Sequence, residues 1–234
     1  MMVSAESRTE EGFSLIALLA VMTLVVIALL AVAPSVQLAV ERERELEAIR
    51  RGEEVAEAIR QYVEFYQGTK LPKSIDDLLE GLPEGTKKRM ILRASAATDP
   101  LSEDGEWRLI TPQSTALLNF GKRVQSYNNG LLPPNGSQML DRFVLPFVNV
   151  INSRSREDLE ASGAEGADYP TSGVDFIGVA TSSRRDSVIS YYGIESRSRW
   201  VFTPLFRGVN AAQIVPMRGP NPRFEPNLQI IPTP

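Results

Sequence analysis

The sequence predicts an α+β fold in which a long N-terminal helix, with a transmembrane half and a stalk half, packs on a small antiparallel β-sheet. Three observations predict it. A run of 29 residues without charge, Gly12 to Val40, exceeds the roughly 20 that a helix needs to cross a bilayer. A charged segment with a helical apolar period follows directly. The C-terminal half contains short runs rich in β-branched and aromatic residues.

Composition narrows the possible functions. The chain has 234 residues, with 25 Lys and Arg against 29 Asp and Glu, and this acidic balance argues against nucleic acid as a partner. It has no His and no Cys, which removes imidazole relays, thiol nucleophiles, the usual zinc sites and disulfides. It also has no Walker A or dinucleotide-binding motif. We therefore expect neither an enzyme nor a bound cofactor.

The uncharged run differs from the apolar core of a secretory signal peptide. It is longer than the roughly 7 to 15 residues of such a core, and the eleven residues before it carry one Arg against three Glu. The triplet Ala31-Val32-Ala33 imitates a cleavage site, so a secreted chain cut after Ala33 stays an alternative. Pro34 removes one helical hydrogen bond and predicts a kinked or loosened turn, which neighbouring helices must satisfy in lipid.

The segment Glu11-Gly12-Phe13-Ser14-Leu15-Ile16 resembles the class III signal of type IV pilins and type II secretion pseudopilins. In that family a prepilin peptidase cuts after the Gly and N-methylates the next residue. The resemblance implies a leader peptide over residues 1–12, cleavage between Gly12 and Phe13, and a mature chain that begins with N-methyl-Phe13. Pro34 lies twenty-two residues into that chain, where the family commonly has a proline. The implied assembly helix includes Leu15, Ile16, Ala17 and Pro34.

The resemblance also implies a pilin-like fold and a function. The chain would be a structural subunit, a pseudopilin or minor pilin, of a type II secretion pseudopilus or a type IV pilus. It would cross the bacterial inner membrane once, with its C-terminal domain in the periplasm, or stand in the assembled filament. The implied partners are prepilin peptidase, other pilin or pseudopilin subunits, membrane lipid, and an inner-membrane assembly platform with its separate ATPase. A signal-anchored periplasmic binding domain that does not polymerise is the alternative.

Two features depart from the family pattern. Ala17 stands where the family normally has a Glu five residues after the cut, a carboxylate thought to neutralise the amino terminus of a neighbouring subunit. Its absence resembles the minor pseudopilin at the filament tip, and a shaft subunit that uses another contact stays open. The positive-inside rule gives the opposite orientation to the family's, because one Arg precedes the apolar run and four follow it: Arg8, then Arg42, Arg44, Arg50 and Arg51.

The helix is predicted to have two parts, a transmembrane or filament-core part over 13–40 and an amphipathic stalk over 41–66. Apolar residues recur in the stalk at helical spacing, namely Ile49, Ala56, Ile59, Val63 and Tyr66, with Gly52 in register. Its charges can form i,i+4 pairs between Glu47 and Arg51 and between Arg60 and Glu64. Gly68 is expected to stop the helix.

Residues 67–215 are predicted to form the pilin-like α+β domain. Ser74 to Gly81 predicts a short helix with Ser74 as its cap. Asp104-Gly105, a pair typical of hairpin turns, precedes a predicted strand over Trp107 to Thr111. A variable, partly mobile insertion is expected near 112–160, with Leu140 to Ile151 as a kinked helix or a strand.

Three further strands are predicted, joined by connections short enough for hairpins: Val174 to Thr181, Ser187 to Tyr192 and Arg199 to Leu205. Residues 216–234 form a Pro-rich tail that is expected to be extended or disordered. Glu165, Asp168 and Asp175 lie near these strands and are weak candidates for calcium, because major pseudopilins bind calcium in a C-terminal loop. No EF-hand loop is present, so no metal site is predicted.

Overall fold

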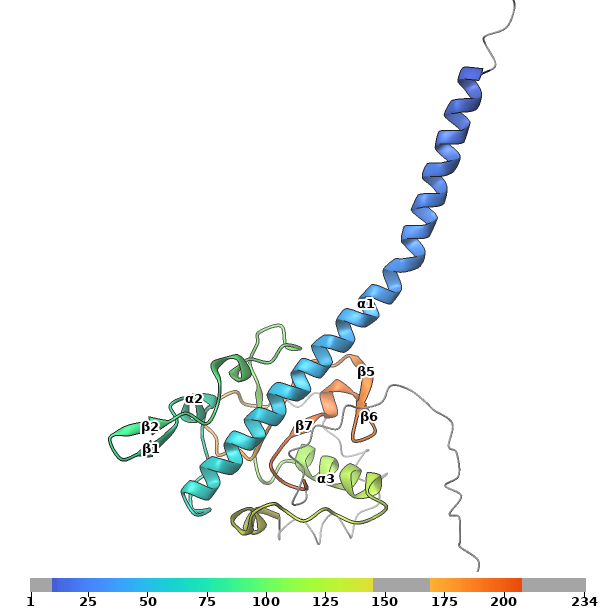
Figure 1. Ribbon diagram of the computed structural model, residues 1–234. Helices are drawn as coiled ribbons and strands as arrows, with labels where there is room; N and C mark the ends of the chain where they lie inside the picture. The colour runs from blue at the N-terminus through green and yellow to red at the C-terminus, as the bar shows by residue number, and fades with distance from the viewer. Residues whose placement is uncertain (1–9, 145–168, 208–234) are drawn as a thin grey trace, which may run out of the picture. The chain divides into compact units, whose positions relative to one another are not determined.

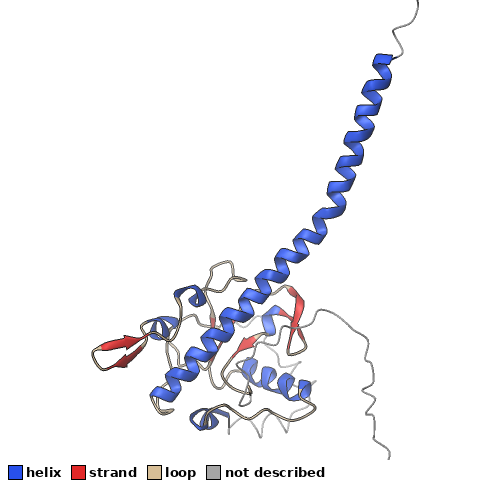
Figure 2. Ribbon diagram, in the orientation of Figure 1, coloured by secondary structure: helices blue, strands red, loops and turns tan. Residues whose placement is uncertain are grey.

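The computed structural model describes residues 10–144 and 169–207 and, within the first helix, the side chains of 15–28 and of 36 onward. The described residues contain one long helix and small antiparallel sheets, which confirms the α+β class (Figure 2). The chain divides into two compact units, Met1–Glu43 and Arg44–Pro234. The start of the predicted leader, most of the predicted insertion beyond residue 144 and the Pro-rich tail lie outside the described residues.

The long helix, α1 (Glu10–Phe65), has 56 residues and does not end at Pro34 (Figure 1). It covers the segment for which the apolar period predicts a stalk, up to Phe65. In that segment the helix buries the face that the apolar period predicts. Its buried residues in the second unit include Ile49, Gly52, Ala56, Ile59 and Val63. Among the described residues, no helix combines the length and the apolar character that a membrane span requires.

The end of α1 differs from the prediction in one detail. Gln67, with φ of 52°, is the first residue in the left-handed region, and Gly68 is the second. The Gly68 N–H donates to the Val63 carbonyl at 2.8 Å, and the Gln67 N–H donates to the Glu64 carbonyl at 3.0 Å. These two bonds make a Schellman motif, so Gln67 occupies the position expected for Gly68.

The short helix α2 (Ile75–Leu79) lies within the segment where the sequence predicts it. Ser74 caps it by a reciprocal pair of bonds: the Asp77 N–H donates to the Ser74 hydroxyl at 3.2 Å, and the Ser74 N–H donates to the Asp77 carboxylate at 3.3 Å. This capping box satisfies two amides that a helix terminus leaves unpaired. Leu78 is fully buried and anchors the helix in the second unit.

The strands of the second unit are all short, and each pairs antiparallel. β4 lies between β3 and β7, β5 pairs with β6, and β1 pairs with β2. Their bounds are β1 Leu82–Glu84, β2 Lys87–Arg89, β3 Arg108–Ile110, β4 Gly178–Ala180, β5 Asp186–Tyr191, β6 Ile194–Ser196 and β7 Val201–Phe202. Two 3-10 helices, η1 (Ala94–Ala97) and η2 (Arg197–Arg199), complete the connections.

The predicted hairpins between the C-terminal strands are wrong. β4 pairs with β3 and β7, whereas β5 pairs with β6, which lies in the segment expected to be a connection. Tyr192 and Gly193 both have positive φ, as a type I′ hairpin turn requires, so the chain reverses directly after β5. Asp104-Gly105 forms a turn that joins no hairpin, because the partner of β3 is β4.

The insertion expected near 112–160 begins with a helix that belongs to the core. α3 (Thr115–Tyr127) is capped by Ser114 and buries Leu117, Phe120, Gly121 and Val124. These positions follow i, i+3, i+4 and i+7 spacing, which makes a helical apolar face that was not predicted from the sequence. Residues 138–144 are helical, so the described part of Leu140 to Ile151 follows the helix alternative.

Candidate assembly helix and its anchor

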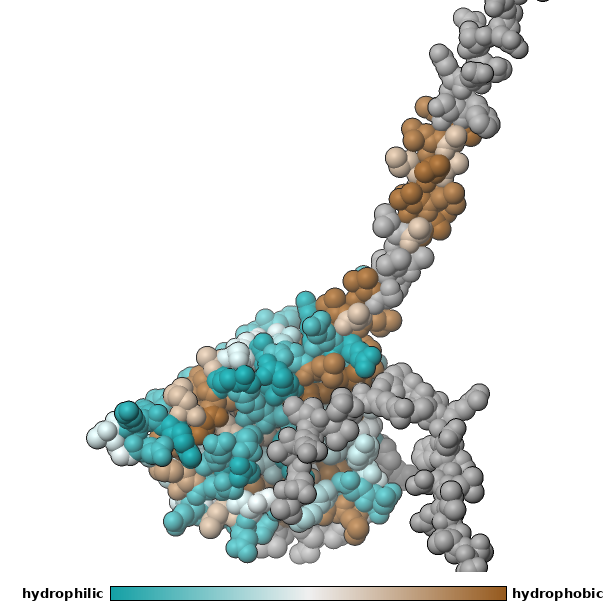
Figure 3. All heavy atoms as spheres, viewed as in Figure 1, coloured by the Kyte–Doolittle hydropathy of each residue, from teal (hydrophilic) through white to brown (hydrophobic). Residues whose placement is uncertain are grey.

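The described part of the first unit contains a helix segment with exposed apolar side chains (Figure 3). Ten large apolar side chains between Leu15 and Ile27 are 48–67% exposed. They occupy almost every position, so no face of this segment is polar. A helix that is apolar all round is normally buried in protein or in a membrane, and exposed apolar surface of this extent marks an interaction site.

Thr23 is the only polar residue between Leu15 and Ala28. Its hydroxyl donates to the Leu19 carbonyl at 2.8 Å, one turn earlier in the same helix. The segment therefore has its polar hydroxyl satisfied internally, as an apolar environment demands.

The residues selected by the sequence have the following positions. Leu15, Ile16 and Ala17 are exposed on α1 and belong to the exposed apolar segment. Gly12, Phe13 and Pro34 lie within α1, and their side chains are outside the described residues.

A buried carboxylate anchors α1 in the second unit just after the apolar segment ends. Glu45 is completely buried and accepts the N–H groups of Val188 and Ile189 of β5, each at 2.9 Å. Arg197, itself 4% exposed, donates to Glu45 through Nε at 2.8 Å and through Nη2 at 2.6 Å. This ion pair fastens the helix to β5 and η2, and breaking one partner of such a pair is strongly destabilising.

Gly52 allows β7 to approach the helix. A Cβ atom at this position would lie 2.3 Å from the ring of Phe202, closer than any side-chain contact permits. The Phe202 ring also packs edge-on against Trp107 at a centroid distance of 5.7 Å. The apolar period selects Gly52 for the buried face, and the aromatic ring explains why that position is a glycine.

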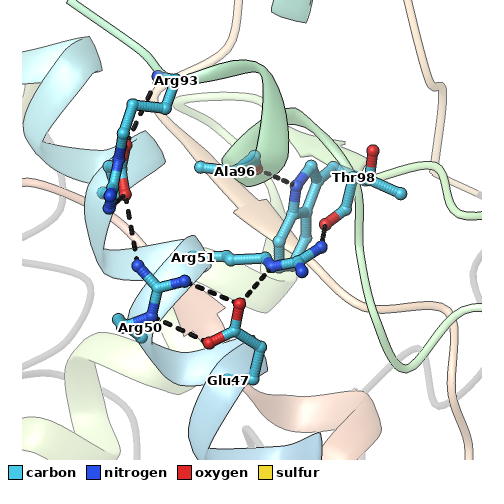
Figure 4. Close-up of polar contacts among 8 residues, drawn as sticks. Glu47, Arg50, Arg51, Arg93, Ala96 and Thr98 are labelled. Atoms are coloured by element: carbon cyan, nitrogen blue, oxygen red, sulfur yellow. Dashed lines mark hydrogen bonds and ion pairs between the residues drawn. The ribbon is translucent and has the colours of Figure 1, made fainter.

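A network of ion pairs and hydrogen bonds ties the connecting loop 93–98, which contains η1, to α1 (Figure 4). Glu47 accepts from Arg50 at 2.6 Å and from Arg51 at 2.7 Å, and these bonds lower its pKa to about 2. Arg51 also donates through Nη1 to the Thr98 carbonyl at 3.2 Å. Arg93 donates through Nε to Glu54 at 2.7 Å. Each exposed pair contributes little, so the network orients the loop more than it stabilises the domain.

A second group of polar side chains, partly buried at Glu53 and Arg207, lies further along α1. Glu53 accepts a hydrogen bond from the Tyr191 hydroxyl and an ion pair from Arg207. Burial raises the pKa of Tyr191 well above its usual value, so the phenol keeps its proton. Glu53 therefore joins the helix to β5 and to the chain beyond β7.

Asp99 is a buried carboxylate with one oxygen that has no hydrogen-bond partner. It is 1% exposed, its Oδ1 accepts the Leu101 N–H at 2.9 Å, and its Oδ2 has no hydrogen-bond partner. Burial raises the pKa of this carboxyl. A buried polar atom without a partner costs free energy, and the cost grows when the group is charged.

Asp99→Asn should stabilise the domain at neutral pH by about 1 kcal/mol, because the amide carries no charge to desolvate. A raised pKa in the folded state means that the wild-type carboxyl contributes most below its unfolded value near 3.9 and loses that contribution as the pH rises. The gain should therefore shrink below about pH 4. Melting curves at both pH values test this, with exposed Asp175→Asn as the control. An unchanged melting temperature at neutral pH would contradict it.

Of the weak calcium candidates, Asp175 is exposed, and Glu165 and Asp168 lie outside the described residues. Within residues 10–144 and 169–207, no group of three Asp or Glu side chains could hold a metal ion.

The residues that anchor the helix were not predicted from the sequence. Glu45 occupies the buried face of α1, three and four residues before Ala48 and Ile49, so its register was a visible signal of burial. Arg197 lies 152 residues away along the chain, and no local pattern links the two.

No family model, no curated protein and no solved structure matches this chain.

Proposed function

We propose that this chain is a structural subunit, a pseudopilin or minor pilin, of a type II secretion pseudopilus or a type IV pilus. Its N-terminal helix assembles it, and it performs no catalysis. Prepilin peptidase removes residues 1–12 and methylates Phe13. The subunit is stored in the bacterial inner membrane with its domain in the periplasm, and a separate ATPase and an assembly platform drive polymerisation.

The observation that carries this proposal is the exposed apolar segment of α1. From Leu15 to Ala28 every described side chain but one is apolar, and the exception, Thr23, is satisfied within the helix. The segment continues as the same helix into a domain with its own packed core. A subunit that passes from lipid into a bundle of identical helices needs this combination, because both environments are apolar.

Assembly by such a helix is packing and involves no bond making. In the membrane, lipid covers the apolar side chains, and in a filament the helices of neighbouring subunits replace lipid. The freed hydrogen-bond acceptor opposite Pro34 also needs a neighbour or water in that environment. Ala17 supplies no carboxylate for a neighbouring amino terminus, which resembles the minor subunit at the filament tip, and a shaft subunit that uses another contact stays open.

A charge within the segment should prevent assembly. Leu24→Asp places a carboxylate at a site that is 67% exposed in the isolated chain. If this site faced water in the cell, the charge would stay hydrated and would cost little free energy. In lipid or a filament core, the same charge costs about 2.5 to 3.5 kcal/mol near the centre of the helix. We expect the variant to disappear from the membrane fraction and from sheared filaments, as measured by immunoblot in cells that contain the assembly machinery.

Leu131→Asp is the matched control, because Leu131 is 75% exposed in a loop outside the segment. It should fractionate like the wild type. Equal behaviour of the two variants would refute the proposal. A wild-type chain that enters membranes but never filaments would favour the signal-anchored binding domain.

A further inference from the structure

The hairpin of β1 and β2 extends from the rest of the second unit (Figure 1). Leu82 is its only buried residue, and every residue from Pro83 to Met90 is exposed. Gly85, with φ of 63°, and Thr86 form its two-residue turn. A two-stranded hairpin is at best marginally stable alone, and this one contributes almost nothing to the core.

The second strand of this hairpin is a run of three cations, Lys87, Lys88 and Arg89. Lys88 lies 3.1 Å from Glu80, and both side chains are more than half exposed, so this pair is weak. Among the described residues, no hydrogen bond or ion pair engages the side chain of Lys87 or Arg89. Glu84 lies opposite Lys87 in the register of the hairpin, so three cations outnumber the hairpin's one carboxylate and its charge is net positive.

The same unit presents a fixed acidic loop between η1 and β3. Asp104 holds this loop, because it accepts bonds from the Ser102 hydroxyl, from the Glu106 N–H at 2.9 Å and from Arg108 at 2.6 Å. Glu103 and Glu106 are exposed, and no described residue forms an ion pair with either. The loop therefore carries two free carboxylates on an ordered backbone.

We propose that the basic hairpin (Lys87 to Arg89) of one copy of this chain binds the acidic loop (Ser102 to Glu106) of a second copy. The two surfaces have opposite charge, and no described ion pair joins them within one chain. A contact between two different patches is heterologous, so it repeats from copy to copy and gives an open filament when the rotation between copies does not close a ring. The proposal rests on the proposed function and adds the surface through which the folded domains meet.

The competing explanation is that Lys87 to Arg89 protect an exposed strand edge from aggregation and contact only water. Natural proteins use lysine at strand edges for that purpose. This explanation requires only the positive charge, and it gives the acidic loop no role. A test must therefore detect the pairing of the two surfaces.

The absence of Cys from the chain makes a disulfide test clean, since no native thiol competes. The full chain with Lys87→Cys and Glu103→Cys is expressed with prepilin peptidase and the assembly machinery, and sheared filaments are oxidised mildly. We expect a ladder of disulfide-linked multimers on a non-reducing gel. The control, Lys87→Cys with Asp175→Cys, keeps the hairpin thiol and moves the other to an exposed acid elsewhere, and it should give no ladder.

Charge reversal provides a second measurement, made in the chain without the introduced cysteines. Lys87→Glu with Arg89→Glu should reduce the yield of sheared filaments, and adding Glu103→Lys with Glu106→Lys should restore it. High salt should weaken the contact in the wild type, because it screens exposed charges. Edge protection predicts no rescue by the lysines on the loop.

The outcomes separate this inference from the proposed function. Filaments without a ladder, or with a ladder equal to that of the control, overturn the inference and leave the function standing. A ladder in membranes without filaments supports the contact and overturns the function. Neither filaments nor a ladder overturns both.

Discussion

Gly12→Ala should leave the chain uncleaved by prepilin peptidase. In the family that the N-terminal segment resembles, the residue before the cut is glycine, and a Cβ atom there obstructs close approach to the backbone. The effect is expected to be all or none: the variant keeps its leader, carries no N-methyl group and enters no filament. Gel mobility of the chain co-expressed with the peptidase measures the outcome.

Ser14→Ala is the matched control, because it introduces the same side chain two residues further on, beyond the cut. It should be processed like the wild type. Cleavage of the Gly12→Ala variant at the wild-type rate contradicts the assignment of Gly12, and an uncleaved wild type favours an anchored domain that does not polymerise.

Glu45→Ala should cost the domain about 3 to 5 kcal/mol of unfolding free energy. The change leaves the guanidinium of Arg197 buried without its partner and removes the acceptor of two β5 amides. Typical domains have only about 5 to 15 kcal/mol of stability, so much of this domain's stability depends on one carboxylate. Guanidinium unfolding of the full chain, followed by the fluorescence of buried Trp107 and Trp200, measures the loss.

Glu47→Ala provides the comparison, since Glu47 lies two residues away on the same helix and forms two partly exposed ion pairs. It should cost about 1 kcal/mol or less. Equal losses in the two variants would show that Glu45 does not anchor the helix as its buried contacts indicate.

The elements that depend on local pattern could be predicted from the sequence. The apolar period of the stalk selects the buried face of α1, and Ser74 with Asp77 makes the capping box of α2. Both rest on residues within one or two turns of each other, where spacing alone defines the neighbours.

The elements and contacts that could not be predicted from the sequence depend mostly on residues far apart in the chain. α3 has a helical apolar period, but turn residues on both sides obscured it. β6 has three residues and depends on β5 for its identity, and the ring that requires Gly52 to be glycine comes from Phe202. For the candidate site, the apolar segment was visible at once, whereas the Glu45–Arg197 anchor needed the folded chain.

The mass of the N-terminal peptide shows whether the N-terminal helix is a processed assembly helix. After co-expression with prepilin peptidase, we expect a peptide that begins with N-methylated Phe13. A peptide that still begins with Met1 or Met2 would contradict processing and leave an anchored domain. A peptide that begins at Pro34 would mean cleavage after Ala33, a secreted chain and no assembly helix.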